Sequence, residues 1–166
     1  MSTNSNYEKV MEFNRAFQLD VPSEPQPALF TKDPALVKLK LDLIREEVKE
    51  LEDAVKEHDL RETVDALADI LYVVYGAGIT FGIDMDKAFD LVHQSNMSKL
   101  CPTEENAKET VEWYKDRFEK GLSPYDTPEY RRDENSGLFI VYNKSSGKVL
   151  KSITYKPVHL DPVLFQ

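Results

Sequence analysis

The chain has 166 residues, of which 41% are hydrophobic and 31% are charged, a composition typical of one soluble globular domain and not of a disordered chain. Its net charge of −9 argues against general binding to the phosphate backbone of nucleic acids. Because no apolar run approaches the roughly 20 residues of a membrane span and the start MSTNSNYEKV lacks the apolar stretch of a signal peptide, we expect a cytoplasmic protein with no membrane partner.

The first half of the chain is predicted to be helical. Apolar residues at helical spacing predict a helix over residues 7–19, and they predict a second helix, about 20 residues long, over residues 35–57. Between these two helices, prolines predict an extended crossover over residues 21–34, because proline fixes φ and removes a backbone donor: Pro22, Pro25, Pro27 and Pro34.

Two further helices are predicted before Cys101. Asp59, followed three residues later by Glu62, is a capping-box pattern that predicts a helix start, and the apolar run after it extends to about residue 81. Gly82 is the expected stop of this third helix. Residues 84–99 predict a fourth helix that opens with an acidic residue.

The sequence after Pro102 changes character. Residues 103–121 predict a polar helix that ends at Gly121. Residues 138–143 alternate as a strand does, and residues 148–155 are again rich in β-formers, so a β-hairpin is predicted between these two segments. The expected fold class is therefore all-α with a four-helix core, closed by a hairpin.

Three carboxylates cluster on the second predicted helix. Glu46 and Glu50 are four residues apart and Glu47 and Glu50 are three apart, so all three lie within one turn. Like charges at this spacing repel, and a cation would relieve the repulsion. On its own, an EExxE pattern is more often a solvated helix face.

The third predicted helix strengthens the case for a metal site. Asp65 and Asp69 are four residues apart in VDALADILYVVYGAGI, where nearly every other side chain is apolar or small, so we expect this helix to be buried almost all round. Buried carboxylates need a partner, and no Lys or Arg lies between Glu62 and Lys87. Metal ligation by Glu47, Glu50, Asp69 and Asp65 is the economical explanation, and oxygen ligands of this kind suit Mg²⁺, or alternatively Mn²⁺.

These motifs carry a family resemblance. The EExxE pattern, followed by an acidic helix ending in DILYVVYGAGITFGID, resembles the MazG-like all-α nucleoside triphosphate pyrophosphohydrolases, relatives of phosphoribosyl-ATP pyrophosphohydrolase and the dimeric dUTPases. The resemblance implies one domain over residues 1–166, with a core at 5–101, an insertion at 102–136, and a hairpin and tail at 137–166.

The second family motif is ExxD. It can be assigned to Asp65 and Asp69, with Ala66 at the Glu position, or to Glu62 and Asp65.

The resemblance implies Mg²⁺-dependent hydrolysis of (deoxy)nucleoside triphosphates between the α- and β-phosphates, giving a monophosphate and pyrophosphate. Glu46 is the expected general base, because a carboxylate at the edge of the cluster can take a proton from the attacking water. Two alternatives stay open. The substrate could be phosphoribosyl-ATP, or the chain could be a non-catalytic helical oligomer that binds partners. The preferred base and sugar depend on the shape of an apolar pocket and not on a motif.

Four residues are candidates for substrate binding. Asn96 and Lys99, near the end of the fourth predicted helix, could supply an amide and a positive charge for phosphate, although a helix C-terminus with a favourable lysine is equally probable. Lys151 and Tyr155 could cover the site, although a strand-edge lysine also protects against aggregation. We expect a homodimer or homotetramer, because four helices leave apolar faces that one subunit does not cover.

Overall fold

The computed structural model describes residues 4–165, which divide into two compact units. Of the described residues, the helical unit comprises 4–89 and 160–165, and the mixed unit comprises Asp90–His159. The division falls within helix α5 (Met85–Met97). The single domain with a core at residues 5–101 stays a prediction.

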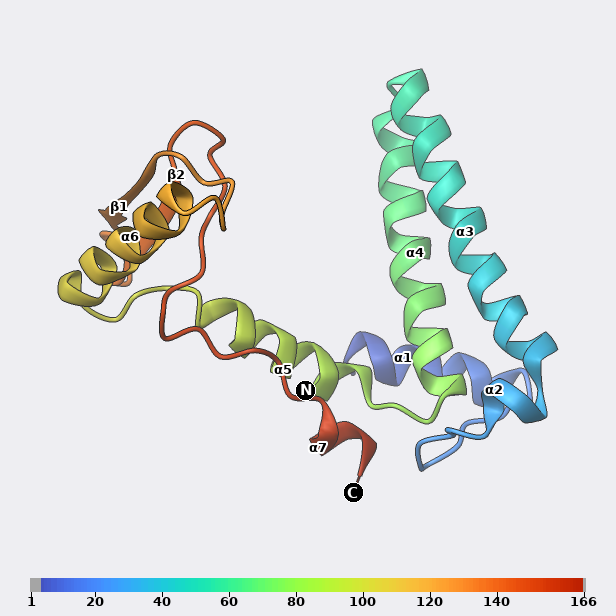
Figure 1. Cartoon of the computed structure of the whole chain (residues 1–166). Coiled ribbons are helices and arrows are strands. Elements are labelled where there is room, and N and C mark those ends of the chain that lie inside the picture. The colour runs from blue at the N-terminus through green and yellow to red at the C-terminus, as the bar shows by residue number, and fades with distance from the viewer. Residues whose placement is uncertain (1–3, 166) are drawn as a thin grey trace. The chain divides into compact units, whose positions relative to one another are not determined.

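A long antiparallel pair of helices forms the helical unit, α3 (Pro34–Glu57) and α4 (Leu60–Thr80), which pack side by side (Figure 1). His58 ends α3 in the left-handed conformation, with φ 58°. The Asp59 side chain then accepts hydrogen bonds from the backbone N–H groups of Arg61 and Glu62, which starts α4. This tight connection sets the two helices antiparallel along their length.

Helix α1 (Asn6–Ala16) packs against α4 through aromatic side chains. Tyr7 lies 6.5 Å from Tyr75 between ring centroids, and Phe13 meets Tyr72 edge-on at 5.6 Å. The helix begins with a complete capping box between Ser5 and Glu8. A one-turn helix, α2 (Leu29–Lys32), lies within the proline-rich crossover and packs on α3.

Gly82 fixes the exit from α4. It has φ +67°, and a Cβ atom at this position would lie 1.9 Å from the backbone oxygen of Glu24. The Gln26 backbone N–H donates to the Phe81 oxygen at 2.9 Å, which holds the crossover against the helix end. Only glycine fits both the left-handed conformation and this close approach.

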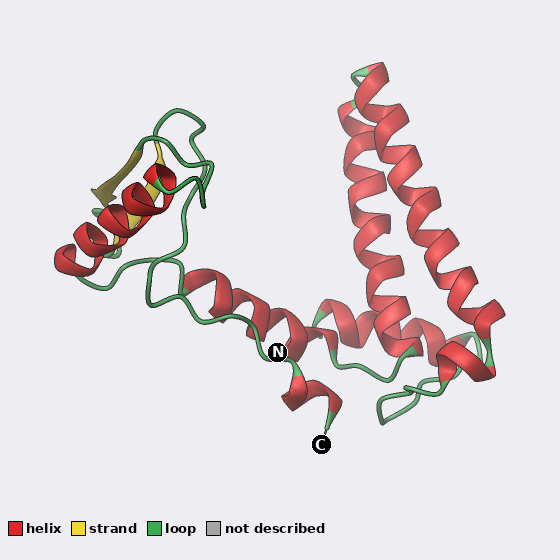
Figure 2. Cartoon of the chain, viewed as in Figure 1, coloured by secondary structure: helices red, strands yellow, loops and turns green. Residues whose placement is uncertain are grey.

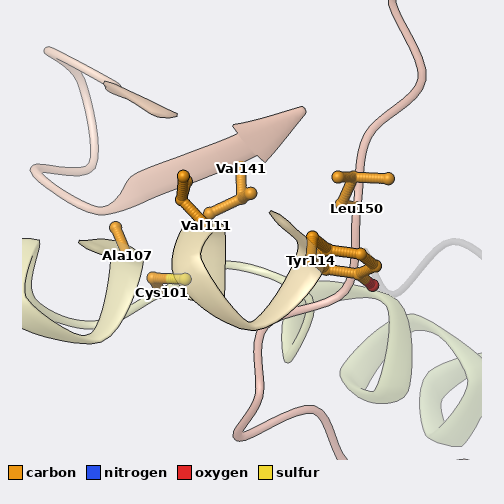
Figure 3. Close-up of a cluster of buried hydrophobic side chains, with 6 residues drawn as sticks. All are labelled: Cys101, Ala107, Val111, Tyr114, Val141 and Leu150. Atoms are coloured by element: carbon orange, nitrogen blue, oxygen red, sulfur yellow. The ribbon is translucent and has the colours of Figure 1, made fainter. Parts of the chain in front are cut away.

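The mixed unit places helix α6 (Glu104–Glu119) against an antiparallel pair of strands, β1 (Pro128–Arg132) and β2 (Phe139–Asn143) (Figure 2). Figure 3 shows its core, in which buried side chains of α6 meet Cys101, which precedes α6, and side chains of β2 and of the tail: Ala107, Val111, Tyr114, Val141 and Leu150. The tail ends in a one-turn helix, α7 (Asp161–Leu164), which belongs to the helical unit.

Buried hydrogen bonds join the tail to α6. The Ser152 hydroxyl donates to the Asn106 carboxamide oxygen at 2.9 Å, and the Ile153 backbone N–H donates to the Thr110 hydroxyl at 3.2 Å. The Ser152 backbone N–H also donates to the Lys99 oxygen at 3.1 Å, at the end of α5. The segment predicted as the second hairpin strand is therefore held mainly by side-chain and loop hydrogen bonds.

The mostly helical fold and the five longer helices were predicted, but two details were wrong. The hairpin pairs 128–132 with 139–143, whereas residues 148–155 form no strand and only an isolated bridge joins Tyr142 to Val149. The strand β1 thus lies inside the segment predicted as a helical insertion. The crossover contains helix α2, which the prolines concealed. The extensive helix–helix contacts within the described residues are α3–α4, α1–α4 and α2–α3, so the predicted four-helix core is not confirmed.

Helix α4 is less buried than predicted, because among residues 4–165 only α1 and α3 make extensive contact with it. Val64, Leu67 and Leu71 on α4 are exposed. Among residues 4–165, α4 is the single helix that is long and apolar enough to span a membrane. Within α4, 17% of the 18-residue apolar stretch is buried. Core helices of soluble proteins have the same length and composition, so this property is weak evidence about location.

Candidate metal and nucleotide site

The acidic residues of α3 and α4 lie together in the middle of the helical hairpin. Burial, followed by the negative charges of Glu50, Asp69, Glu46 and Asp65, raises the pKa of Glu47 above its ordinary value. These four charges come from both helices, so the hairpin brings the two sequence motifs to one place around Glu47. Glu47 is half-buried, whereas the other four carboxylates are exposed.

The basic residues nearest in sequence do not neutralise this cluster. Arg45 pairs with Asp42 at 3.1 Å, and Lys49 pairs with Asp53 at 2.6 Å. Over residues 4–165, the ion pairs and hydrogen bonds include none made by the five cluster carboxylates. Lys49 therefore pairs outside the cluster, whereas the exposure of four of the five carboxylates is what a solvated helix face also predicts.

A divalent cation fits the donor set of this cluster. Carboxylate oxygens are hard ligands, and the mutual repulsion that raises the pKa of Glu47 has no positive side chain to relieve it. As the side chains stand, no three His, Cys, Asp or Glu residues in the described chain are gathered closely enough to hold one ion. The exposed side chains of the cluster, such as Glu50 and Asp69, would have to move closer together to complete a coordination shell.

The geometry bears on the choice between the two forms of the second acidic motif. Asp65 and Asp69 are among the charges that act on Glu47, whereas Glu62 is not. Glu62 stands in the first turn of α4, where its backbone N–H donates to Asp59. The register that includes Asp65 and Asp69 therefore places both acidic residues opposite Glu47. The exposure of Asp65 and Asp69 corrects the expectation that they are buried.

The four predicted substrate-binding residues all lie in the mixed unit, where they form two adjoining pairs. The Lys99 ammonium donates to the Asn96 carboxamide oxygen at 2.7 Å, and the Lys151 ammonium lies 4.5 Å from the Tyr155 ring centroid. The Ser95 hydroxyl, next to Asn96, lies 3.2 Å from the Tyr155 hydroxyl. The tail therefore packs on the end of α5 and brings these candidates into one neighbourhood.

Sequence reasoning missed a polar cavity in the helical unit. Asn14 on α1 and Lys40 on α3 line it, together with residues of the crossover. Asn14 occupies a position of α1 that is buried together with Val10, one turn earlier on the same face. The sequence signal for this cavity is an amide, Asn14, at a buried position of an amphipathic helix, and no motif contains this residue.

Comparison with known proteins gives the family. The model of the phosphoribosyl-ATP pyrophosphohydrolase family matches residues 10–96, which span α1 to α5 and include both acidic clusters. This chain belongs to that family. The family is part of the MazG-like all-α nucleoside triphosphate pyrophosphohydrolase superfamily, so its members indicate pyrophosphohydrolase activity in general. The chain is also similar to the uncharacterized protein L479 of Acanthamoeba polyphaga mimivirus, with 32% identity over 92% of each chain.

Proposed function

We propose that this member of the family is a divalent-metal-dependent hydrolase of (deoxy)nucleoside triphosphates that releases pyrophosphate and a nucleoside monophosphate. The observation that carries the proposal is the uncompensated carboxylate cluster around Glu47, built from both helices of the hairpin. A cluster of this kind binds a triphosphate only when cations lie between the two, because the bare carboxylates would repel the phosphates. We retain the cytoplasm as the expected compartment.

Glu47, Glu50, Asp69 and Asp65 would hold the ion, which we propose is Mg²⁺ or Mn²⁺. When bound, the ion supplies positive charge for the phosphate oxygens. The cluster orients the triphosphate by this charge, and no side-chain nucleophile is required. Since all four ligands come from two paired helices, the hairpin itself sets the position of the phosphates.

Glu46 is the proposed general base. Glu46 is exposed at the edge of the cluster, and its negative charge is close enough to raise the pKa of Glu47. In the proposed step, the water oxygen forms a bond to phosphorus as the bridging P–O bond between the α- and β-phosphates breaks. The proton of the water passes to the Glu46 carboxylate, and pyrophosphate leaves. Four further residues are proposed to bind the substrate: Asn96 through its amide, Lys99 and Lys151 through their positive charges, and Tyr155 through its ring.

The proposed active form is a homodimer or homotetramer. Helix α4 carries exposed apolar side chains: Val64, Leu67 and Leu71. Exposed apolar side chains on α3 extend the apolar surface of the hairpin: Leu39, Val48 and Val55. An apolar surface of this kind on a soluble chain is normally covered by another protein surface. A second copy would complete the helical packing that one chain leaves unfinished.

Metal dependence tests this proposal directly. We expect Mn²⁺ to bind the protein in a calorimetric titration and Mg²⁺ or Mn²⁺ to be required for pyrophosphate release from a panel of nucleoside triphosphates that includes phosphoribosyl-ATP. Asp69→Asn should lose both metal binding and activity. Glu52→Gln is the matched control, because Glu52 is exposed on the same helix as Glu47 and does not act on its pKa. Activity that persists in a chelator, or that survives in Asp69→Asn, would refute the metal site.

A further inference from the structure

The small sheet of the mixed unit has one covered edge and one open edge. On the outer side of β2, Phe139 exchanges two backbone hydrogen bonds with Cys101, at 2.8 and 2.9 Å. Further along the same edge, the Val141 oxygen accepts from the Leu150 N–H at 2.8 Å. Over residues 4–165, the strand pairs and bridges include no segment on the outer side of β1. Strand β1 is therefore the open edge, and an open edge is a template for another strand.

The register of the strand pair shows which backbone groups of β1 point to the open edge. The residues that flank β1, Thr127 and Asp133, each bond across to the other side of the strand pair at 2.8 Å. Because hydrogen bonding alternates along an antiparallel strand, the odd-numbered residues of β1 bond to β2 and the even-numbered residues point outward. The outward groups are the N–H groups of Tyr130 and Arg132, and the oxygens of these two residues and of Pro128. None of them has a hydrogen-bond partner among the described residues.

The side chains of β1 alternate between the two faces of the sheet. Tyr130 faces α6 and packs against the core of the mixed unit. Glu129 and Arg131 lie on the opposite face, where the Arg131 guanidinium is 5.1 Å from the Tyr142 ring centroid. Glu129 pairs with Lys144 at 2.8 Å, whereas Arg131 is exposed and takes part in no ion pair within residues 4–165. This face of β1 thus carries a negative and a positive side chain two residues apart.

We propose that β1 pairs with β1 of a second copy of this chain, antiparallel and centred on Tyr130, so that the two sheets join into one. In this register the Tyr130 N–H donates to the Tyr130 oxygen of the second copy, and the Arg132 N–H donates to its Pro128 oxygen, with the same bonds in return. Each outward N–H of β1 then has an acceptor. The N–H that proline lacks falls at the end of the paired stretch, where it interrupts no bond.

Charge complementarity is the reason that a second copy is the occupant. With Tyr130 on the two-fold axis, Glu129 lies opposite Arg131 of the second copy, and Arg131 lies opposite its Glu129. Opposite charges on facing residues stabilise an antiparallel pair, and like charges destabilise it. Charged side chains usually protect a sheet edge, but this alternation of sign selects a strand of the same sequence. On the face towards α6, the Glu104 carboxylate near Tyr130 is already neutralised by Lys108 at 2.9 Å.

The length of β1 implies that this pairing acts together with another interface. The strand has five residues, and a stable interface buries roughly 1,200 Å² or more, which one pair of short strands does not reach. A weak contact becomes effective when another interface already holds the copies together, because its formation is then intramolecular. In the proposed assembly this other interface is the apolar surface of α3 and α4, so β1 pairing joins dimers into a tetramer or a longer array. The inference does not depend on the proposed catalytic reaction.

Disulfide trapping on the full chain tests the register. The natural Cys101 is fully buried and does not interfere. Facing residues that are not hydrogen-bonded to each other have Cα atoms about 4.5 Å apart, which suits a disulfide. Glu129→Cys and Arg131→Cys chains, expressed together with different tags and oxidised, should form covalent dimers between the two variants. Each variant alone should form few, because residue 129 lies opposite 131 and not opposite itself. Glu134→Cys, an exposed position outside the strands, replaces Glu129→Cys as the control.

Charge exchange separates the pairing from the folding of the mixed unit. Arg131→Glu or Glu129→Arg alone should weaken the association of dimers about tenfold or more, because like charges then face each other, whereas the double variant should restore it. Sedimentation velocity measures the masses, and circular dichroism shows that each variant folds. Leu71→Glu acts on the other interface and should give monomers. A wild-type chain with no species above the dimer, a double variant as weak as the single ones, or no excess of the mixed cross-link over the control overturns the proposal.

Discussion

Glu47 on α3 and Asp69 on α4 face one another across the helical hairpin, and after burial and the charge of Glu50 it is the charge of Asp69 that most raises the pKa of Glu47. Two motifs that are about 20 residues apart in sequence meet because α3 and α4 are antiparallel around the turn at His58 and Asp59. The negative charges on both sides of the hairpin repel one another.

The first prediction concerns Glu47. Glu47→Gln should raise the stability of the metal-free protein by a few tenths of a kcal/mol, because it removes the like-charge contacts that raise the pKa of this carboxyl. The same change should abolish pyrophosphate release, since Glu47 is a proposed ligand. Thermal unfolding in a chelator measures the first effect and an enzyme assay the second. Glu52→Gln should change neither, and a loss of stability in Glu47→Gln would contradict the repulsion described here.

The second prediction concerns assembly. Leu71 is 55% exposed on α4, which a single chain leaves uncovered. We expect the wild-type chain to be a dimer or larger at micromolar concentration, and Leu71→Glu to shift it towards the monomer, because the charge would be buried in an apolar interface. Light scattering after gel filtration measures both. Lys87→Glu, an exposed change on α5, is the control. A wild-type chain with the mass of a monomer would show that the open face of the hairpin is not an interface.

The third prediction concerns Gly82. Gly82→Ala should destabilise the protein by about 2 kcal/mol or more, because alanine is strained at φ +67° and its Cβ would strike the Glu24 backbone oxygen. Gly121→Ala separates the two causes: Gly121 has φ +69° with nothing within 4 Å, so it should cost only the conformational term of about 1 kcal/mol. Urea denaturation gives both values. Equal losses in the two variants would mean that the crossover does not press on the end of α4.

The fourth prediction concerns acid. Hydrogen bonds from Ser145 and then Asn143 lower the pKa of Asp126 below its ordinary value of 3.8. A carboxyl with a lowered folded pKa stabilises the fold above its unfolded pKa, and this contribution is lost as the pH falls through the folded pKa. Asp126→Asn should therefore lower the melting temperature of the mixed unit near pH 7, and its difference from wild type should shrink below about pH 4.

The single tryptophan reports on this fourth prediction. Trp113 lies on α6 in the mixed unit, so its fluorescence follows the unfolding of that unit. Glu109→Gln is the control, since Glu109 is exposed on the same helix. A difference between Asp126→Asn and wild type that stays constant from pH 7 to pH 3 would show that the hydrogen bonds from Ser145 and Asn143 do not act on the charged form of Asp126.

The sequence predicted the five longer helices well because their ends are set locally. Asp59 caps α4, Thr103 caps α6 and Gly82 takes the left-handed conformation after α4, and each of these signals can be read from a few neighbouring residues. The hairpin was placed incorrectly because strand pairing is not local. Residues 148–155 have the composition of a strand, but Ser152 and Ile153 bond to side chains of α6 in place of a neighbouring strand.

The acidic cluster could be predicted and the cavity could not. Helical spacing alone places Glu46, Glu47 and Glu50 in one turn, and the short turn at Asp59 then brings Asp65 and Asp69 opposite. The exposure of Asp69 was not predicted, because it depends on how many helices one chain packs together. The cavity joins Asn14 to Lys40 through the fold of the crossover, and no spacing in the sequence relates these two residues.

The products of hydrolysis test the central claim most directly. The protein is incubated with a deoxynucleoside triphosphate and Mg²⁺, and the products are separated and followed by ³¹P NMR, with Asp69→Asn and a chelator as negative controls. We predict a nucleoside monophosphate and pyrophosphate in equal amounts from the wild-type protein and from Glu52→Gln, and no product in either negative control. A nucleoside diphosphate and inorganic phosphate, or no hydrolysis of any triphosphate in the panel, would contradict the account.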